Sequence, residues 1–83
     1  MKYKIEFNKK ALKFIQKQPK DKRQSILKAI YNLPLGDTKA IQGHRGFYRL
    51  RIGDYRVIYT LDNGKCIICV IDAGNRGDIY KRY

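Results

Sequence analysis

The sequence predicts a single α+β domain over residues 1–83, in the order β-α-α-β-β-β, with a largely antiparallel sheet and two N-terminal helices on one face. Three observations support this fold class. The chain opens with an alternating apolar and charged segment, continues with two apolar repeats of helical period, and is rich in β-branched and aromatic residues after residue 46. A chain of 83 residues has room for one small domain.

The first strand is expected over residues 2–7, where apolar and charged side chains alternate. Asn8 follows as a good helix N-cap, because its side-chain oxygen can accept from the N–H groups of the first turn. Pro19 then ends this first helix. Its apolar stripe consists of Ala11, Leu12 and Ile15.

The second helix is expected to open at Pro19, since proline is tolerated in the first helical turn. Asp21 is well placed near the positive end of the helix dipole, and Pro34 closes the helix. The apolar stripe is made of Ile26, Leu27, Ile30 and Leu33. Residues 35–46 contain three glycines and little periodicity, which predicts a loop.

Three strands are expected after this loop, over Phe47–Ile52, Tyr55–Leu61 and Lys65–Ile71. Gly53-Asp54 suits a type II′ turn between the first two, and Asn63-Gly64 suits a type I′ turn between the last two. The third strand is apolar on both faces, which favours a central position covered by helices on one side.

Two-residue turns fix which side chains share a face of the sheet. They place Arg51 opposite Arg56 in the first hairpin, and Arg56 opposite Ile71 in the second. One face collects the apolar residues Tyr48, Leu50, Ile52, Val57, Tyr59, Leu61, Ile68 and Val70, and the other collects Phe47, Arg49, Arg51, Arg56, Ile58 and Thr60. Like charges directly opposite each other cost a few tenths to ~1 kcal/mol, so the three arginines indicate a site for an anion such as phosphate.

The formal net charge of +12 also points to a polyanionic partner: first nucleic acid, then an acidic protein, and then an anionic membrane. Ten of the twelve lysines lie in residues 1–39, whereas six of the seven arginines lie in residues 45–82. Lysines at helical spacing on the first helix form either its solvated face or an RNA contact. The residues assigned to RNA binding are Lys10, Lys13, Lys17 and Arg45. No apolar run is long enough to span a bilayer, and residues 1–6 lack the apolar core of a signal peptide, so a cytoplasmic protein is expected.

The remaining candidates for chemistry are few. Residues 72–80 are expected to continue the last strand and turn on two glycines, with Arg76 in a tight loop and Tyr80 a turn later. Cys66 and Cys69 would point to opposite faces of a strand, which suits neither a shared metal nor a disulfide. The seven acidic residues are scattered, which argues against a two-metal nuclease, and the single histidine lies in the 35–46 loop.

The segment FYRLRIGDYRVIY at Phe47–Tyr59, with GNRGDIY at Gly74–Tyr80, resembles the RelE/ParE toxin superfamily of type II toxin–antitoxin systems. The likeness extends over nearly the whole chain and includes its length, charge and element order. It implies a microbial-RNase-like fold. The GDYRVIY segment is shared by the RNase and gyrase-directed branches, and in the RelE branch the resemblance implies cleavage of mRNA in the ribosomal A site.

The resemblance also implies site residues. The RNase branch uses basic residues on the sheet, an arginine after the last strand and a tyrosine near the C-terminus. These map onto Arg49, Arg51, Arg56, Arg76 and Tyr80, which we assign as the catalytic set. Two departures are evident. Many relatives have His or Lys at the position of Asn75, and RelE-like members often have Lys at the first two sheet positions, where arginine is a poor base because it stays protonated.

The expected reaction is a metal-independent transesterification of RNA that uses no cofactor. The expected partners are an acidic cognate antitoxin, mRNA and the ribosome. Two other functions remain open: a non-enzymatic ParE-like toxin acting on DNA gyrase, and a basic nucleic-acid-binding module. The pairing of Arg76 with Tyr80 favours the RNase, whereas the absence of a conventional base at Asn75 favours the gyrase-directed toxin.

Overall fold

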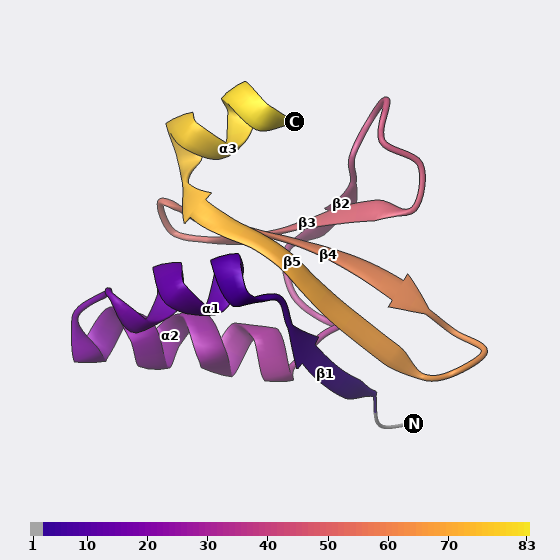
Figure 1. The fold of residues 1–83 in the computed structure, drawn as a ribbon, viewed down its shortest axis with the longest axis horizontal. Coiled ribbons are helices and arrows are strands. Elements are labelled where there is room, and N and C mark those ends of the chain that lie inside the picture. The colour runs from indigo at the N-terminus through magenta and orange to yellow at the C-terminus, as the bar shows by residue number, and fades with distance from the viewer. Residues whose placement is uncertain (1–2) are drawn as a thin grey trace.

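The computed structural model describes residues 3–83, which form one five-stranded sheet with three helices (Figure 1). The elements are β1 (Lys4–Phe7), α1 (Lys9–Gln16), α2 (Lys20–Tyr31), β2 (Thr38–Ala40), β3 (Phe47–Ile52), β4 (Tyr55–Asp62), β5 (Ile67–Asn75) and α3 (Arg76–Arg82). The strand order is β1-β5-β4-β3-β2, with β1 parallel to β5 and all other neighbours antiparallel. The predicted α+β fold with a largely antiparallel sheet is therefore confirmed. Lys2, predicted to begin the first strand, lies outside the described residues.

The two N-terminal helices begin where the sequence predicts. The Asn8 side chain accepts hydrogen bonds from the backbone N–H groups of Lys10 (2.8 Å) and Ala11 (3.3 Å), a cap that contributes about 1 kcal/mol. Pro19 directly precedes α2, and Asp21 lies in its first turn. No helix within residues 3–83 is long and apolar enough to cross a membrane.

The hydrophobic core lies between these two helices and one face of the sheet. Figure 1 shows α1 and α2 side by side on that face. The buried cluster consists of Ala11, Ile15, Ile26, Ile30, Leu33, Leu50, Val57, Tyr59, Ile68, Val70 and Ala73, with Tyr48, Ile52 and Leu61 packed against it. All eight residues predicted for the apolar face of the sheet are included, so that prediction is confirmed.

The pairing of β3 with β4 also follows the prediction. Gly53 has a φ of +56° and Asp54 has no positive φ, as a type II′ turn requires, and Arg51 lies opposite Arg56. The pairing of β4 with β5 differs. The turn contains residues 63–66, and the carboxylate of Asp62 just before it accepts a hydrogen bond from the N–H of Lys65. Further along this pair, between Ile58 and Tyr59 of β4, β5 has one extra residue, which forms a bulge. Arg56 therefore lies opposite Gly74 rather than Ile71.

Two elements were not predicted. β2 lies within the supposed 35–46 loop, where three residues of an edge strand pair with β3. Residues 76–82 form α3 rather than a glycine turn, so Arg76 is a helical residue and Gly74 belongs to β5. A Cβ at Gly74 would lie 3.2 Å from Arg82 Nη2 and 3.3 Å from Ile79, so a side chain there would push these residues of α3 away by a few tenths of an ångström.

α3 is held to the sheet by the carboxylate of Asp72, which is only 1% exposed. Arg82 Nε donates to Asp72 Oδ2 at 2.9 Å, and the N–H of Ala73 donates to Oδ1 at 2.9 Å. Tyr83 Oη donates to Oδ2 at 3.3 Å, and Lys10 Nζ of α1 lies 3.6 Å from the same oxygen. Burial and the Asp72 charge raise the pKa of Tyr83, which keeps its phenol protonated as a donor.

Replacing Asp72 should therefore detach α3 and weaken the whole domain. Asp72→Asn keeps the shape but removes the charge that accepts from Arg82, and hydrogen bonds to a charged group contribute about 1.5–3 kcal/mol. We expect urea unfolding to show a loss of that order. Glu6→Gln, at an exposed position of β1, is the control and should cost under about 1 kcal/mol. Equal stabilities for the two variants would contradict this role.

Candidate functional site

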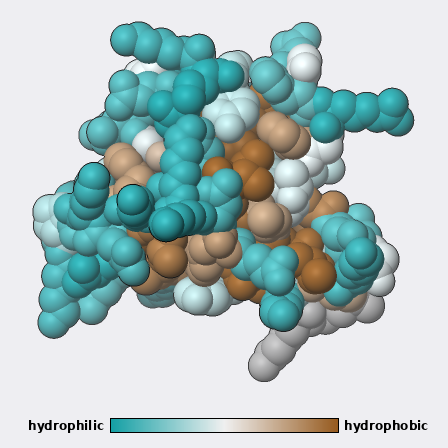
Figure 2. All heavy atoms as spheres, viewed as in Figure 1, coloured by the Kyte–Doolittle hydropathy of each residue, from teal (hydrophilic) through white to brown (hydrophobic). Residues whose placement is uncertain are grey.

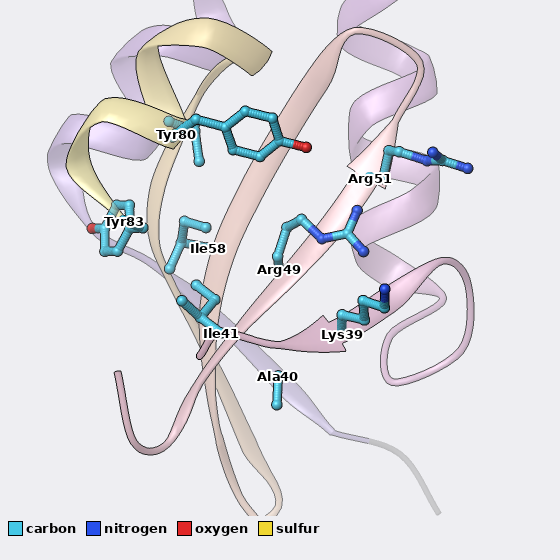
Figure 3. A pocket seen from close by; sticks show the side chains of 9 residues that line it. Lys39, Ala40, Ile41, Arg49, Arg51, Ile58, Tyr80 and Tyr83 are labelled. Carbon is cyan, nitrogen blue, oxygen red and sulfur yellow. The ribbon is translucent and has the colours of Figure 1, made fainter. Parts of the chain in front are cut away.

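A pocket of 340 Å³ opens on the face of the sheet opposite the core, between β2, β3 and α3 (Figure 3). Buried Ile58 of β4 and Ile79 of α3 both line it, so α3 packs across this face of the sheet. The residues that line it are Lys39, Ala40, Ile41, Arg49, Arg51, Ile58, Ile79, Tyr80 and Tyr83. Figure 3 shows cationic side chains on one side and the ring of Tyr80 facing them.

Arg49 and Arg51 reach this pocket from alternate positions of β3, as predicted. Both are paired with a residue that the sequence did not single out. Arg51 Nε lies 2.6 Å from Asp37 Oδ2, and Arg49 Nη2 lies 3.7 Å from Asp37 Oδ1. A carboxylate thus offsets part of the repulsion among the arginines.

Tyr80 lies on α3 with its side chain exposed to solvent and flanked by two arginines. The guanidinium carbons of Arg56 and Arg76 lie 5.9 and 5.7 Å from the centre of its ring, within the range of a cation–π contact. A hydrogen bond from Arg56 lowers the pKa of Tyr80 below its ordinary value of 10. The charges of Arg56, Arg76 and Arg49 act in the same direction, partly offset by desolvation.

Arg56 differs from the other arginines because it is buried, with 4% of its surface exposed. Its Nη1 donates to the carbonyl oxygens of Gly53 (2.7 Å) and Tyr55 (2.8 Å). Neither Arg56 nor Arg76 lines the pocket. The structure therefore brings Arg49, Arg51 and Tyr80 together around the pocket and places Arg56 and Arg76 against the Tyr80 ring.

An aromatic cluster borders the pocket near the C-terminus. His44 packs against Phe47 with ring centres 6.1 Å apart and against Tyr83 at 5.4 Å. Lys39 and Tyr83 also line the pocket but are absent from the predicted site, because the sequence predicts a loop over residues 35–46 and a turn after Gly74. A signal for α3 was present: Asp78 suits the first turn of a helix, and Lys81 suits the last.

The residues assigned to RNA binding do not line this pocket. Lys10, Lys13 and Lys17 line a separate groove between α1 and α3, and Arg45 is exposed in the segment between β2 and β3. In Figure 2, hydrophilic side chains gather over the two N-terminal helices and around α3, with apolar surface between them.

Metal-ligating side chains are not grouped in the described part of the chain. No cluster of three or more His, Cys, Asp or Glu occurs there that could hold an ion. Cys69 lies in β5, but Cys66, which is expected on the same strand, lies in the turn before it with a φ of +55°, and both are half-buried.

Comparison with known sequences shows the family to which the chain belongs. The sequence profile of the ParE toxin of type II toxin–antitoxin systems (parDE) matches residues 5–80. The chain belongs to this toxin family. It is therefore a toxin of the RelE/ParE superfamily, as the two sequence segments predicted. No curated protein sequence matches it.

Solved structures of RelE toxins share the fold. RelE in the RelE–RelB complex of Pyrococcus horikoshii is 28% identical, with 93% of this chain and 98% of that chain covered and a TM-score of 0.76. RelE of Methanococcus jannaschii, in a RelB–RelE complex, is 27% identical over 94% and 98% of the two chains, with a TM-score of 0.72. The Escherichia coli RelBE complex, at 23% identity over 88% and 95%, shows the same fold with a TM-score of 0.75.

The arginines around Tyr80 should lower the pH at which its phenol loses a proton. We expect Tyr80 to lose its proton below pH 10, because nearby positive charge stabilises the phenolate. Arg76→Gln removes one charge and should raise the pKa of Tyr80 toward 10. NMR of tyrosine labelled with ¹³C at Cζ follows each phenol separately. Arg45→Gln is the matched control and should leave Tyr80 unchanged; an equal change in both variants would contradict a local effect.

Proposed function

We propose that this toxin is a metal-independent endoribonuclease that cleaves mRNA on the ribosome and so inhibits translation in the cytoplasm. The main support is the grouping of Arg49 and Arg51 with Tyr80 around one pocket. Arginine presents two parallel N–H donors to a phosphate, and tyrosine rings stack on unpaired RNA bases. This combination suits a single-stranded RNA backbone with a base turned out beside it.

The proposed reaction uses the RNA's own 2′-hydroxyl. Its oxygen attacks the adjacent phosphorus and the bond from phosphorus to the 5′ oxygen breaks, which leaves a 2′,3′-cyclic phosphate and a 5′-hydroxyl. One proton leaves the 2′ oxygen and one reaches the 5′ oxygen. Arg49, Arg51 and Arg76 would stabilise the charge that develops on the phosphate oxygens.

Tyr80 is the side chain that we assign to proton transfer in this reaction, in addition to stacking. Its lowered pKa brings a phenol closer to the range in which it exchanges protons readily. Arg56, buried behind the ring, would act by positioning Tyr80 and lowering its pKa rather than by touching RNA. DNA lacks the 2′-hydroxyl and would not be cut.

A second candidate function rests on the family that matched. The ParE profile covers residues 5–80, and the ParE-like alternative is a toxin that acts on DNA gyrase without cleaving phosphodiesters. A gyrase-directed toxin has no need of Arg76 and Tyr80 in a phosphate site. These two residues therefore separate the candidates.

Arg76→Ala should abolish RNA cleavage and growth inhibition. Arg76 is exposed, so its loss should leave the fold intact. Brief induced expression followed by mapping of RNA ends should show new 5′-hydroxyl ends with the natural chain and none with the variant. Lys81→Ala, an exposed cation on the same helix, is the matched control and should remain toxic. Growth inhibition with DNA damage and no new RNA ends would favour the gyrase-directed candidate instead.

The proposed inhibitor of this toxin is an acidic cognate antitoxin. The RelE proteins of Pyrococcus horikoshii and Methanococcus jannaschii were crystallised as complexes with RelB. For a chain of net charge +12, an acidic segment that folds on the basic surface would compete with RNA and neutralise several cations. The apolar surface visible between the helices would supply anchors for its hydrophobic side chains.

Salt should affect the two rates of this binding differently. We expect association to slow steeply as salt rises, because long-range attraction is screened, while dissociation changes little because apolar contacts hold the complex. Surface plasmon resonance at several salt concentrations measures both rates. Complete dissociation at ~0.5 M salt would show that binding is electrostatic only and would contradict the apolar anchors.

A further inference from the structure

We infer that Asp37 is an internal anion that occupies the RNA-phosphate position at Arg49 and Arg51 in the free toxin and must release them when RNA binds. This inference rests on the proposed function. The two Asp37 oxygens face Arg51 Nε at 2.6 Å and Arg49 Nη2 at 3.7 Å. Two oxygens of a phosphate meet arginine donors in the same way, so carboxylate and phosphate compete for these groups.

The placement of Asp37 explains how three arginines coexist on neighbouring strands. Arg51 lies directly opposite Arg56, a like-charge pair that destabilises a sheet. Nη1 of Arg56 donates to two carbonyl oxygens, whereas Arg49 and Arg51 both pair with the carboxylate of Asp37. The free toxin thus carries its own counter-charge at this point.

The backbone around Asp37 allows the carboxylate to leave without unfolding β2. The Asp37 carbonyl oxygen accepts from the N–H of Arg51 at 2.9 Å, which holds its main chain against β3. Its side chain is 45% exposed, so rotation about χ1 can turn it into solvent. Arg51 is also more than half exposed and remains accessible to an incoming phosphate.

The test is binding of a short 2′-O-methyl oligoribonucleotide, which cannot be cleaved, measured by fluorescence anisotropy. Asp37→Asn should bind roughly threefold to fivefold more tightly than the natural chain, since it removes a competing exposed charge. It should also melt at a lower temperature, because the free toxin loses its counter-charge. If Asp37 had only a structural role, its replacement would lower both the stability of the toxin and its affinity for the oligonucleotide.

Three further variants test whether the gain in RNA affinity is specific to the Asp37 carboxylate. Glu6→Gln makes the same charge change on β1, at the other edge of the sheet, and should alter affinity much less. Asp37→Glu keeps the charge and should retain the weaker binding. In an Arg51→Gln background, Asp37→Asn should have a smaller effect than in the natural chain, because one of the two competed groups is gone.

The outcomes separate this inference from the proposed function. Unchanged or weaker binding by Asp37→Asn overturns the inference and leaves the nuclease open. Tighter binding without any RNA cleavage in cells supports the inference and counts against the nuclease. If neither protein binds the oligonucleotide, Asp37 does not compete with RNA and the inference is wrong, whereas the nuclease is decided by the RNA ends mapped in cells.

Discussion

The buried carboxylate of Asp72 is the contact on which the arrangement of the site depends. It receives hydrogen bonds from the backbone of β5 and from the C-terminal residues Arg82 and Tyr83, and it lies beside Lys10 of α1. A helix of seven residues with a glycine near its start has little stability of its own. Because α3 carries Tyr80 and begins at Arg76, the geometry of both depends on this one anion.

The bulge in β5 is what makes Asp72 available for this task. Without an extra residue near Ile71, strand alternation would turn the Asp72 side chain toward the helices α1 and α2, into the apolar core. With it, Asp72 faces α3 and Ala73 joins the core. One extra residue in β5 thus places Ala73 in the core on one face of the sheet and the charge of Asp72 on the other.

The sequence predicted those parts of the structure that local patterns specify. Asn8 and Pro19 mark the helices because caps and prolines act within a few residues, and Gly53 fixes the β3–β4 register through its positive φ. The register of β4 with β5 differs from the prediction because the Asp62 side chain stabilises a longer turn than the two-residue turn expected at Asn63-Gly64.

The remaining features depend on tertiary contacts and were not readable from local patterns. β2 has three residues and is held by the backbone of β3, so it leaves no periodic signal. The alternation of side chains along the strands predicts three arginines on one face. It does not predict the burial of Arg56, or the ion pairs of Asp37 with Arg49 and Arg51. Those contacts depend on where residues distant in sequence meet.

The shortness of β1 has a consequence for how copies of this chain meet one another. β1 pairs with residues 67–70 of β5, so residues 71–75 form an edge without a neighbouring strand. Such edges attract strands from other molecules. Here the N–H of Ala73 is already taken by Asp72, and Lys10 and Arg82 flank the edge with positive charge. A second copy, carrying the same charge of +12, finds no available donor at Ala73 and is repelled, so this edge resists sheet-to-sheet aggregation.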